Sequence, residues 1–190
     1  TMTTQEIVEI LGGGKEASTL FTIVPGLRLD QIKNRFKKVG YSEAEVEAAF
    51  DPGQYASHPA LSTKPKSASL EGYIFPESFK LTASTPAKDI VRQSLDEMAK
   101  RLTADRVNGF NAQGLTTHQA VILASIIEKE IYIPEDKRVV AQIFLKRLRE
   151  GVSLGSDVTY IYAAAVYGGA ESPDLDNPYN TRKYAGLPPG

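Results

Sequence analysis

The second half of the sequence is divided into helices by residues that start and stop them. A capping box that begins at Thr116 predicts a helix over 116–132. A proline at a first helical position and a closing Gly151 predict a second helix over 134–150. A third, over 157–168, is capped by the serine that precedes it and ends in glycine. This half of the chain is therefore expected to be helical.

The first half mixes strand and helix signals. β-branched and aromatic residues that end in Pro-Gly predict a strand over 18–26. Apolar residues at helical spacing predict a helix over 86–103. The other expected elements are short helices over 5–11, 28–39 and 42–50, a long loop over 51–69 and an aromatic-rich extended segment over 70–81. This order of elements predicts an α+β fold, mostly helical with a small sheet.

The composition excludes several kinds of site. The 190 residues include no cysteine, which excludes a thiolate nucleophile, a Cys-ligated zinc site and disulfides. A net charge of −1 provides no field that would attract nucleic acid. No P-loop, GxGxxG or HExxH pattern occurs, and the two histidines, His58 and His118, stand far apart in a loop and in the first turn of a helix. We therefore expect no metal site and no nucleic-acid partner.

The helix predicted over 116–132 carries two carboxylates near its end, in "ILASIIEKEIY". On a helical wheel Glu130 falls inside the apolar arc, and Glu128 falls at the edge of that arc, about 160° away. Ser125 and Lys129 fall on the opposite face, which we expect to be in solvent. A carboxylate on an apolar face is costly unless it is protonated or paired. Glu130 is therefore the unusual residue of this helix.

Two interpretations of Glu130 remain open from the residues alone. Burial raises the pKa of a carboxyl group, which suits a general acid that must keep its proton near neutral pH. Alternatively, Glu130 extends into solvent at the helix end or pairs with a base such as Arg138 or Arg147. The wheel does not decide between these interpretations.

The loops favour carbohydrate as the substrate class. Sugar sites combine aromatic faces, which stack on sugar rings, with amide and carboxylate groups, which bind hydroxyls. The stretches "EGYIFPESF" and "DNPYNT" supply both kinds of group.

Five motifs follow one another between residues 70 and 190: "EGYIFPES", "ASIIEKE", "QIFLKRLREG", "SDVTYIY" and "YNTRKYAGLPPG". Together they resemble the YceG-like family of endolytic murein transglycosylases. The resemblance implies that 18–190 form an α+β catalytic domain, mostly helical with a small sheet and without its C-terminal part. Residues 1–17 resemble the end of the LysM-like subdomain that precedes this domain. The chain is therefore expected to be a soluble piece of a longer protein whose membrane anchor lies outside it.

Four positions depart from the family pattern. Ile131 stands where a small residue is usual, and Val158 replaces the proline of the "SDPT" motif. Lys146 replaces an asparagine, and Arg182 replaces the second aromatic of the "YNTY" motif. None of these changes removes an acidic residue, so we expect activity to survive. They do put in question the substrate contacts at Lys146 and Arg182.

The resemblance implies cleavage of the β-1,4 bond between N-acetylmuramic acid and N-acetylglucosamine, which limits the length of nascent glycan strands. No cofactor is implied, because the 6-hydroxyl of the muramic acid attacks its own anomeric carbon and one carboxylic acid suffices. We assign that acid to Glu130, from the wheel and from the second glutamate of the "EKE" motif, with Glu128 as a fallback or supporting residue. The residues expected to line the substrate cleft are Glu71, Tyr73, Phe75, Glu77, Ser156, Asp157, Tyr179, Asn180 and Thr181.

Two other functions stay open from the sequence. One is a glycan-binding scaffold without turnover in the cell-wall synthesis machinery, and the other is a hydrolase with Asp157 or Glu71 as its second carboxylate. Peptidoglycan glycan strands are the expected ligand in each case, and cell-wall synthases are candidate partners. The implied location is the extracytoplasmic face of the bacterial cytoplasmic membrane.

Overall fold

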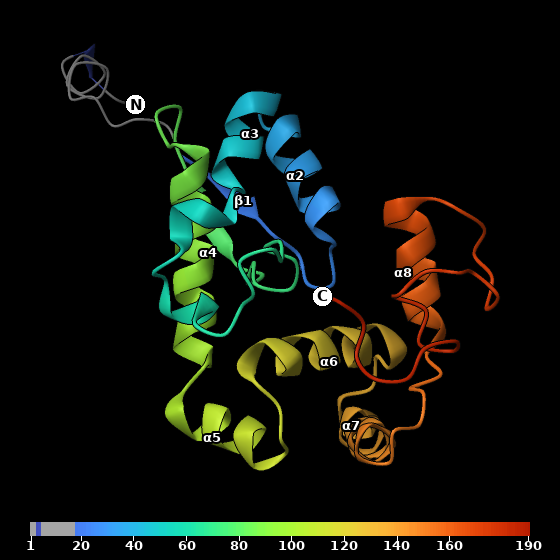
Figure 1. Ribbon diagram of the computed structural model, residues 1–190. Helices are drawn as coiled ribbons and strands as arrows, with labels where there is room; N and C mark the ends of the chain where they lie inside the picture. The colour runs from blue at the N-terminus through green and yellow to red at the C-terminus, as the bar shows by residue number, and fades with distance from the viewer. Residues whose placement is uncertain (1–2, 5–17) are drawn as a thin grey trace.

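The computed structural model describes residues 3–4 and 18–190, and its fold is α+β, as predicted (Figure 1). The strands β1 (Thr19–Thr22) and β2 (Ser78–Leu81) form an antiparallel pair in which Phe21 lies opposite Phe79, and both phenylalanines face the core. The helices are α2 (Leu29–Lys38), α3 (Glu43–Ala49), α4 (Ala87–Arg101), α5 (Ala104–Ala112), α6 (Thr117–Glu130), α7 (Pro134–Arg149) and α8 (Asp157–Tyr167).

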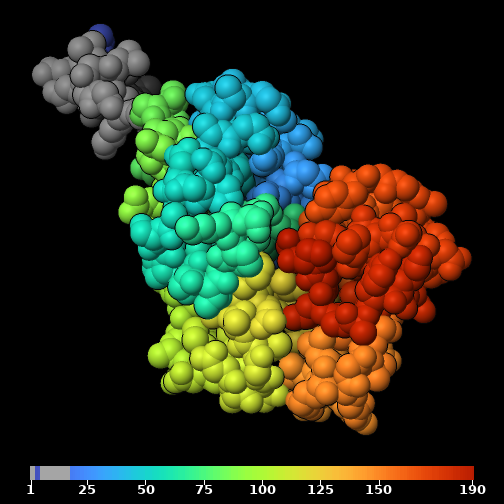
Figure 2. All heavy atoms as spheres, viewed as in Figure 1, coloured from blue at the N-terminus to red at the C-terminus, as the bar shows by residue number. Residues whose placement is uncertain are grey.

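Two hydrophobic cores form, one in each half of the chain. The first lies among the two strands, α2, α3, α4 and the loops between them, and contains the fully buried Phe36, Leu70 and Leu95. The second lies among α6, α7 and the segment before α8, and contains Leu123 and Leu154. Figure 1 shows α6 between the elements of the first core and the helices α7 and α8. In Figure 2 the C-terminal segment, in red, meets the first half of the chain.

Within residues 18–190 the predicted helix starts are confirmed. Ser42 and Thr116 each accept a hydrogen bond from the backbone N–H three residues on, and a glutamate or glutamine completes each capping box. Pro134 is the first residue of α7. Ser156 precedes α8 as expected, but its side chain does not cap the helix.

Other expectations differ from the structure. The strand expected over 18–26 is only four residues long, and 70–81 are extended as a strand only from residue 78. The expected loop 51–69 contains two 3₁₀ turns, Pro52–Tyr55 and Pro59–Leu61, which bury apolar side chains. Helix α5 was not predicted at all. The helix expected over 5–11 and the LysM-like tail expected over 1–17 lie outside the described residues.

No helix in the described part of the chain is long and apolar enough to cross a lipid bilayer.

Candidate active site

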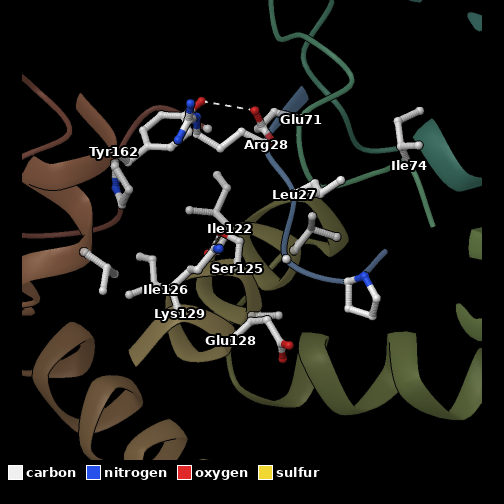
Figure 3. A pocket seen from close by; sticks show the side chains of 18 of the residues that line it. Leu27, Arg28, Glu71, Ile74, Ile122, Ser125, Ile126, Glu128, Lys129 and Tyr162 are labelled. Atoms are coloured by element: carbon white, nitrogen blue, oxygen red, sulfur yellow. Dashed lines mark hydrogen bonds between the residues drawn. The ribbon is translucent and has the colours of Figure 1, made fainter. Parts of the chain in front are cut away.

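A cleft of about 460 Å³ lies between the two halves of the molecule (Figure 3). One wall comes from the turn after β1 and the loop before β2, and the other comes from α6 and α8. Most of the lining side chains are apolar. The polar and charged groups that could contact a ligand in the cleft are few: Arg28, Glu71, His118, Ser125, Glu128, Lys129, Thr159, Tyr162 and Tyr179.

Glu130 does not lie on a buried face, and this part of the wheel prediction is wrong. Helix α6 ends at Glu130, and Ile131 continues as extended chain, so no next turn covers the carboxylate, which is exposed. Its Oε2 accepts a hydrogen bond of 2.7 Å from the hydroxyl of Ser156. Within residues 18–190 no basic side chain forms an ion pair with Glu130, since Arg147 instead donates to the carbonyl of Leu154. Glu130 is thus solvent-accessible and oriented by a serine.

A buried network holds Ser156 in place. Ser156 is 1% exposed, and its backbone N–H donates to Oγ1 of Thr181 at 3.2 Å. The hydroxyl of Thr159 donates to the Ser156 carbonyl at 2.7 Å and lies 3.0 Å from Oγ1 of Thr181. Buried polar groups are stable only when they are hydrogen-bonded, and here each is. The network therefore fixes the start of α8 against the end of α6.

Asn180 supports this network from the core rather than from the cleft surface. It is fully buried, and its side-chain amide donates to the carbonyls of Pro173 and Leu175, both at 2.8 Å. Its Oδ1 accepts the backbone N–H of Arg182. Neither Asn180 nor Thr181 lines the cleft, so both act by holding the loop that follows α8.

Glu128 lies on the rim of the cleft, where it is exposed and ion-paired with Lys137 of α7. The negative charge of the Glu128 carboxylate is therefore already paired with the Lys137 ammonium group. The two glutamates of α6 contact different partners, which agrees with the wheel prediction that they do not point to one spot.

Glu71 is the desolvated carboxylate of the cleft. Its oxygens accept the backbone N–H of Leu29, at 3.0 and 3.2 Å, and the hydroxyl of Tyr162 at 3.3 Å (Figure 3). Burial raises the pKa of the Glu71 carboxyl above its ordinary value, although these hydrogen bonds act in the opposite direction. The environment that the sequence suggested for Glu130 is thus found at Glu71.

We expect Glu71→Gln to change how stability depends on pH. The raised pKa means that the folded protein keeps the Glu71 proton at a pH where the unfolded chain has lost it. The free energy of unfolding therefore falls as pH rises from the ordinary value of 4.5 towards the raised one. Urea denaturation between pH 4 and 8 should show this fall in the parent protein and a flatter profile in Glu71→Gln. Parallel profiles for the two proteins would contradict the prediction.

Of the other residues expected in the cleft, Phe75 and Tyr179 line it. The Tyr179 ring lies 5.2 Å from that of Tyr162 and 5.3 Å from that of Tyr167, and its hydroxyl donates to the Gly190 carbonyl. These three tyrosines form an aromatic cluster at the edge of the cleft.

The remaining residues expected there lie elsewhere. Tyr73 is a core residue whose pKa burial raises to about 12, and its hydroxyl is hydrogen-bonded to Nδ1 of His118 at 2.9 Å. Glu77 accepts the N–H of Ser78 and lies outside the cleft. Asp157 is ion-paired with Arg182 at the surface.

Sequence reasoning missed Tyr162 and did not predict that Lys129 lines the cleft. Tyr162 belongs to the "SDVTYIY" motif, but nothing in the spacing of that motif indicates which of its tyrosines contacts Glu71. Lys129 is exposed, as the wheel predicted, but its side chain also lines the cleft. Both depend on how α6 and α8 pack against the first half of the chain.

The whole chain, residues 1–190, matches the YceG-like family. It is 28% identical over 221 residues to the endolytic murein transglycosylase of Streptococcus pneumoniae serotype 2 (strain D39 / NCTC 7466), a match that covers 100% of this chain and 40% of that protein. It is 29% identical over 125 residues to the endolytic murein transglycosylase of Bacillus subtilis (strain 168), covering 64% of this chain and 34% of that protein. The chain thus spans less than half the length of these curated relatives.

Among solved structures, the fold resembles the crystal structure of the yceG-like protein lmo1499 from Listeria monocytogenes. The TM-score is 0.75 at 27% identity, and the match covers 100% of this chain and 68% of that chain. The family match over the whole chain and this shared fold agree with the five motifs. The chain belongs to the YceG-like family.

Proposed function

We propose that this chain carries the catalytic part of a lytic transglycosylase that acts on peptidoglycan glycan strands. The observation that carries the proposal is the accessible carboxylate of Glu130, which a buried serine orients at the end of α6, just outside the residues that line the cleft. The names of the curated relatives, endolytic murein transglycosylases, support the substrate class and the reaction. Residues 18–190 would form the catalytic domain, and its product would be a strand that ends in 1,6-anhydro-N-acetylmuramic acid.

In this reaction Glu130 acts first as an acid and then as a base. It protonates the glycosidic oxygen as the bond from that oxygen to the anomeric carbon of the muramic acid breaks. The 6-hydroxyl oxygen of the same sugar forms the new bond to the anomeric carbon, and its proton passes to the Glu130 carboxylate. No water is consumed, and the enzyme returns to its starting protonation state. The hydrogen bond from Ser156 to Oε2 leaves Oε1 free for both transfers.

Removal of the Ser156 hydroxyl should impair turnover more than stability. In the described structure the Ser156 hydroxyl donates to Glu130, while the buried network uses the backbone N–H and carbonyl of Ser156. We expect Ser156→Ala to lower kcat about tenfold or more, because the acid loses its orientation, with KM and thermal stability nearly unchanged. Steady-state kinetics and a thermal melt check this. An unchanged kcat would show that the hydrogen bond has no part in turnover.

A non-catalytic scaffold and a hydrolase are the competing functions. Glu71 is the second carboxylate that a hydrolase would need, since Asp157 is occupied by Arg182 outside the cleft. The mass of the products separates the three functions. Anhydro-ended fragments from purified glycan strands support the transglycosylase, fragments heavier by one water indicate a hydrolase, and intact strands indicate binding alone.

A further inference from the structure

Lys129 places a positive charge in the cleft. It belongs to the face of α6 that also carries Ser125, and this face becomes a cleft wall because the turn after β1 and the loop before β2 pass over it (Figure 3). The ammonium group extends to the far wall, since a Cβ atom at Gly26 would lie 3.4 Å from Nζ of Lys129. Lys129 thus spans the cleft from α6 to the turn that follows β1.

The other charged groups of the cleft have partners. Arg28 forms a bidentate pair with Asp30, with both hydrogen bonds at 2.9 Å. Glu128 pairs with Lys137, and Glu71 accepts its bonds from a backbone N–H and a tyrosine hydroxyl. No ion pair or hydrogen bond of the Lys129 ammonium is found in the part of the chain that the structure describes.

The surroundings make Lys129 a site for an anion. The cleft walls next to it are largely apolar, and they screen a charge less than bulk water does. A negative group that enters the cleft would therefore find in Lys129 a cation without an ion-pair partner among the described residues, while the carboxylates of Glu71 and Glu128 are already hydrogen-bonded or ion-paired. An ammonium group binds such a charge as a point donor, without the fixed geometry that a guanidinium imposes.

We propose that Lys129 binds a carboxylate of the substrate, and so selects muramic-acid-containing strands over neutral glycans. This inference rests on the proposed function, because it takes the peptidoglycan strand as the ligand. The carboxylate has two possible sources with the same chemistry. It is the free lactyl carboxylate of muramic acid in strands without peptides, or an acid group of the attached peptide in strands where the lactyl carboxylate is consumed in an amide bond.

Binding measurements on the Glu130→Gln chain test this without turnover. The ligands are peptide-free peptidoglycan strands, peptide-bearing strands and neutral N-acetylglucosamine oligomers of matched length. We expect Lys129→Met to raise Kd for at least one carboxylate-bearing ligand about fivefold, with no change for the neutral oligomers. The effect should shrink as salt concentration rises, and Lys129→Arg should retain most of the affinity. Lys38→Met, at an exposed position on α2, is the matched control and should change nothing.

The ligand that responds identifies the source of the carboxylate. An effect on peptide-free strands assigns the lactyl group, and an effect on peptide-bearing strands alone assigns the peptide. Equal weakening of all three ligands, or of none, overturns the inference. The proposed function is tested separately by the products of the parent chain. Anhydro-ended products together with an unaffected Lys129→Met variant would overturn the role of Lys129 and leave the transglycosylase intact.

Discussion

Glu130→Gln should abolish cleavage of glycan strands and leave the protein folded. Glutamine keeps an oxygen that can accept the hydrogen bond from Ser156, so the end of α6 should hold its position. It can neither protonate the glycosidic oxygen nor accept the proton of the 6-hydroxyl. Because one residue serves both steps, we expect the rate of anhydro-product formation to fall about 10³-fold or more. Mass spectrometry of digests of peptide-poor strands measures this rate, and a thermal melt checks the fold.

Two matched variants make the test specific. Glu128→Gln removes a carboxylate two residues away that is paired with Lys137, and Glu71→Gln removes the desolvated carboxylate of the cleft. If Glu130 is the acid, both variants should retain measurable turnover. A Glu130→Gln chain with near-normal turnover, or a greater loss in either control, would reassign the acid.

Asn180→Ala should cause a large loss of stability. The fully buried amide of Asn180 satisfies the carbonyls of Pro173 and Leu175 and the N–H of Arg182. Alanine has no side-chain amide, so these three backbone groups would lose their hydrogen bonds to residue 180. These hydrogen bonds are partly buried, and an unsatisfied buried polar group costs about 1–3 kcal/mol, so we expect the free energy of unfolding to fall by about 1–3 kcal/mol. Urea denaturation measures the change.

The same substitution should also lower activity, because Thr181 follows Asn180 and holds Ser156. Asn111→Ala is the matched control, at an exposed position in α5, and should cost less than about 0.5 kcal/mol. If the two variants were equally stable, the loop after α8 would not depend on the Asn180 amide.

Helix boundaries were well predicted because their signals are local. A capping box needs only residues that stand three apart, and those at Ser42 and Thr116 form as the sequence indicated. Helix α5 was missed because it lacks the usual signal: none of its residues is buried, and it contains Gly109. The signal for the start of α5 is nevertheless local, since the Thr103 hydroxyl accepts a hydrogen bond from the backbone N–H of Arg106. A search for caps alone would have found it.

The burial of the carboxylates could not be predicted from one helix. The wheel treats each residue as if the helix continued and one face met the core, and neither condition holds at Glu130, where α6 ends in solvent. Glu71 gave no periodic signal because it lies in a turn. Its desolvation results from the start of α2 and from Tyr162, which is 91 residues away in the sequence.

The sequence by itself determined the starts of most helices, the α+β class and, through its five motifs, the family. These properties depend on nearby residues or on their order along the chain. Tertiary structure alone decided which face of α6 became a cleft wall, so that the exposed Lys129 lines the cleft. Tertiary structure also decided that the Ser156 hydroxyl donates a hydrogen bond to Glu130 and does not cap α8, the helix that Ser156 precedes. Both outcomes depend on contacts between segments far apart in the chain, and no local pattern encodes such contacts.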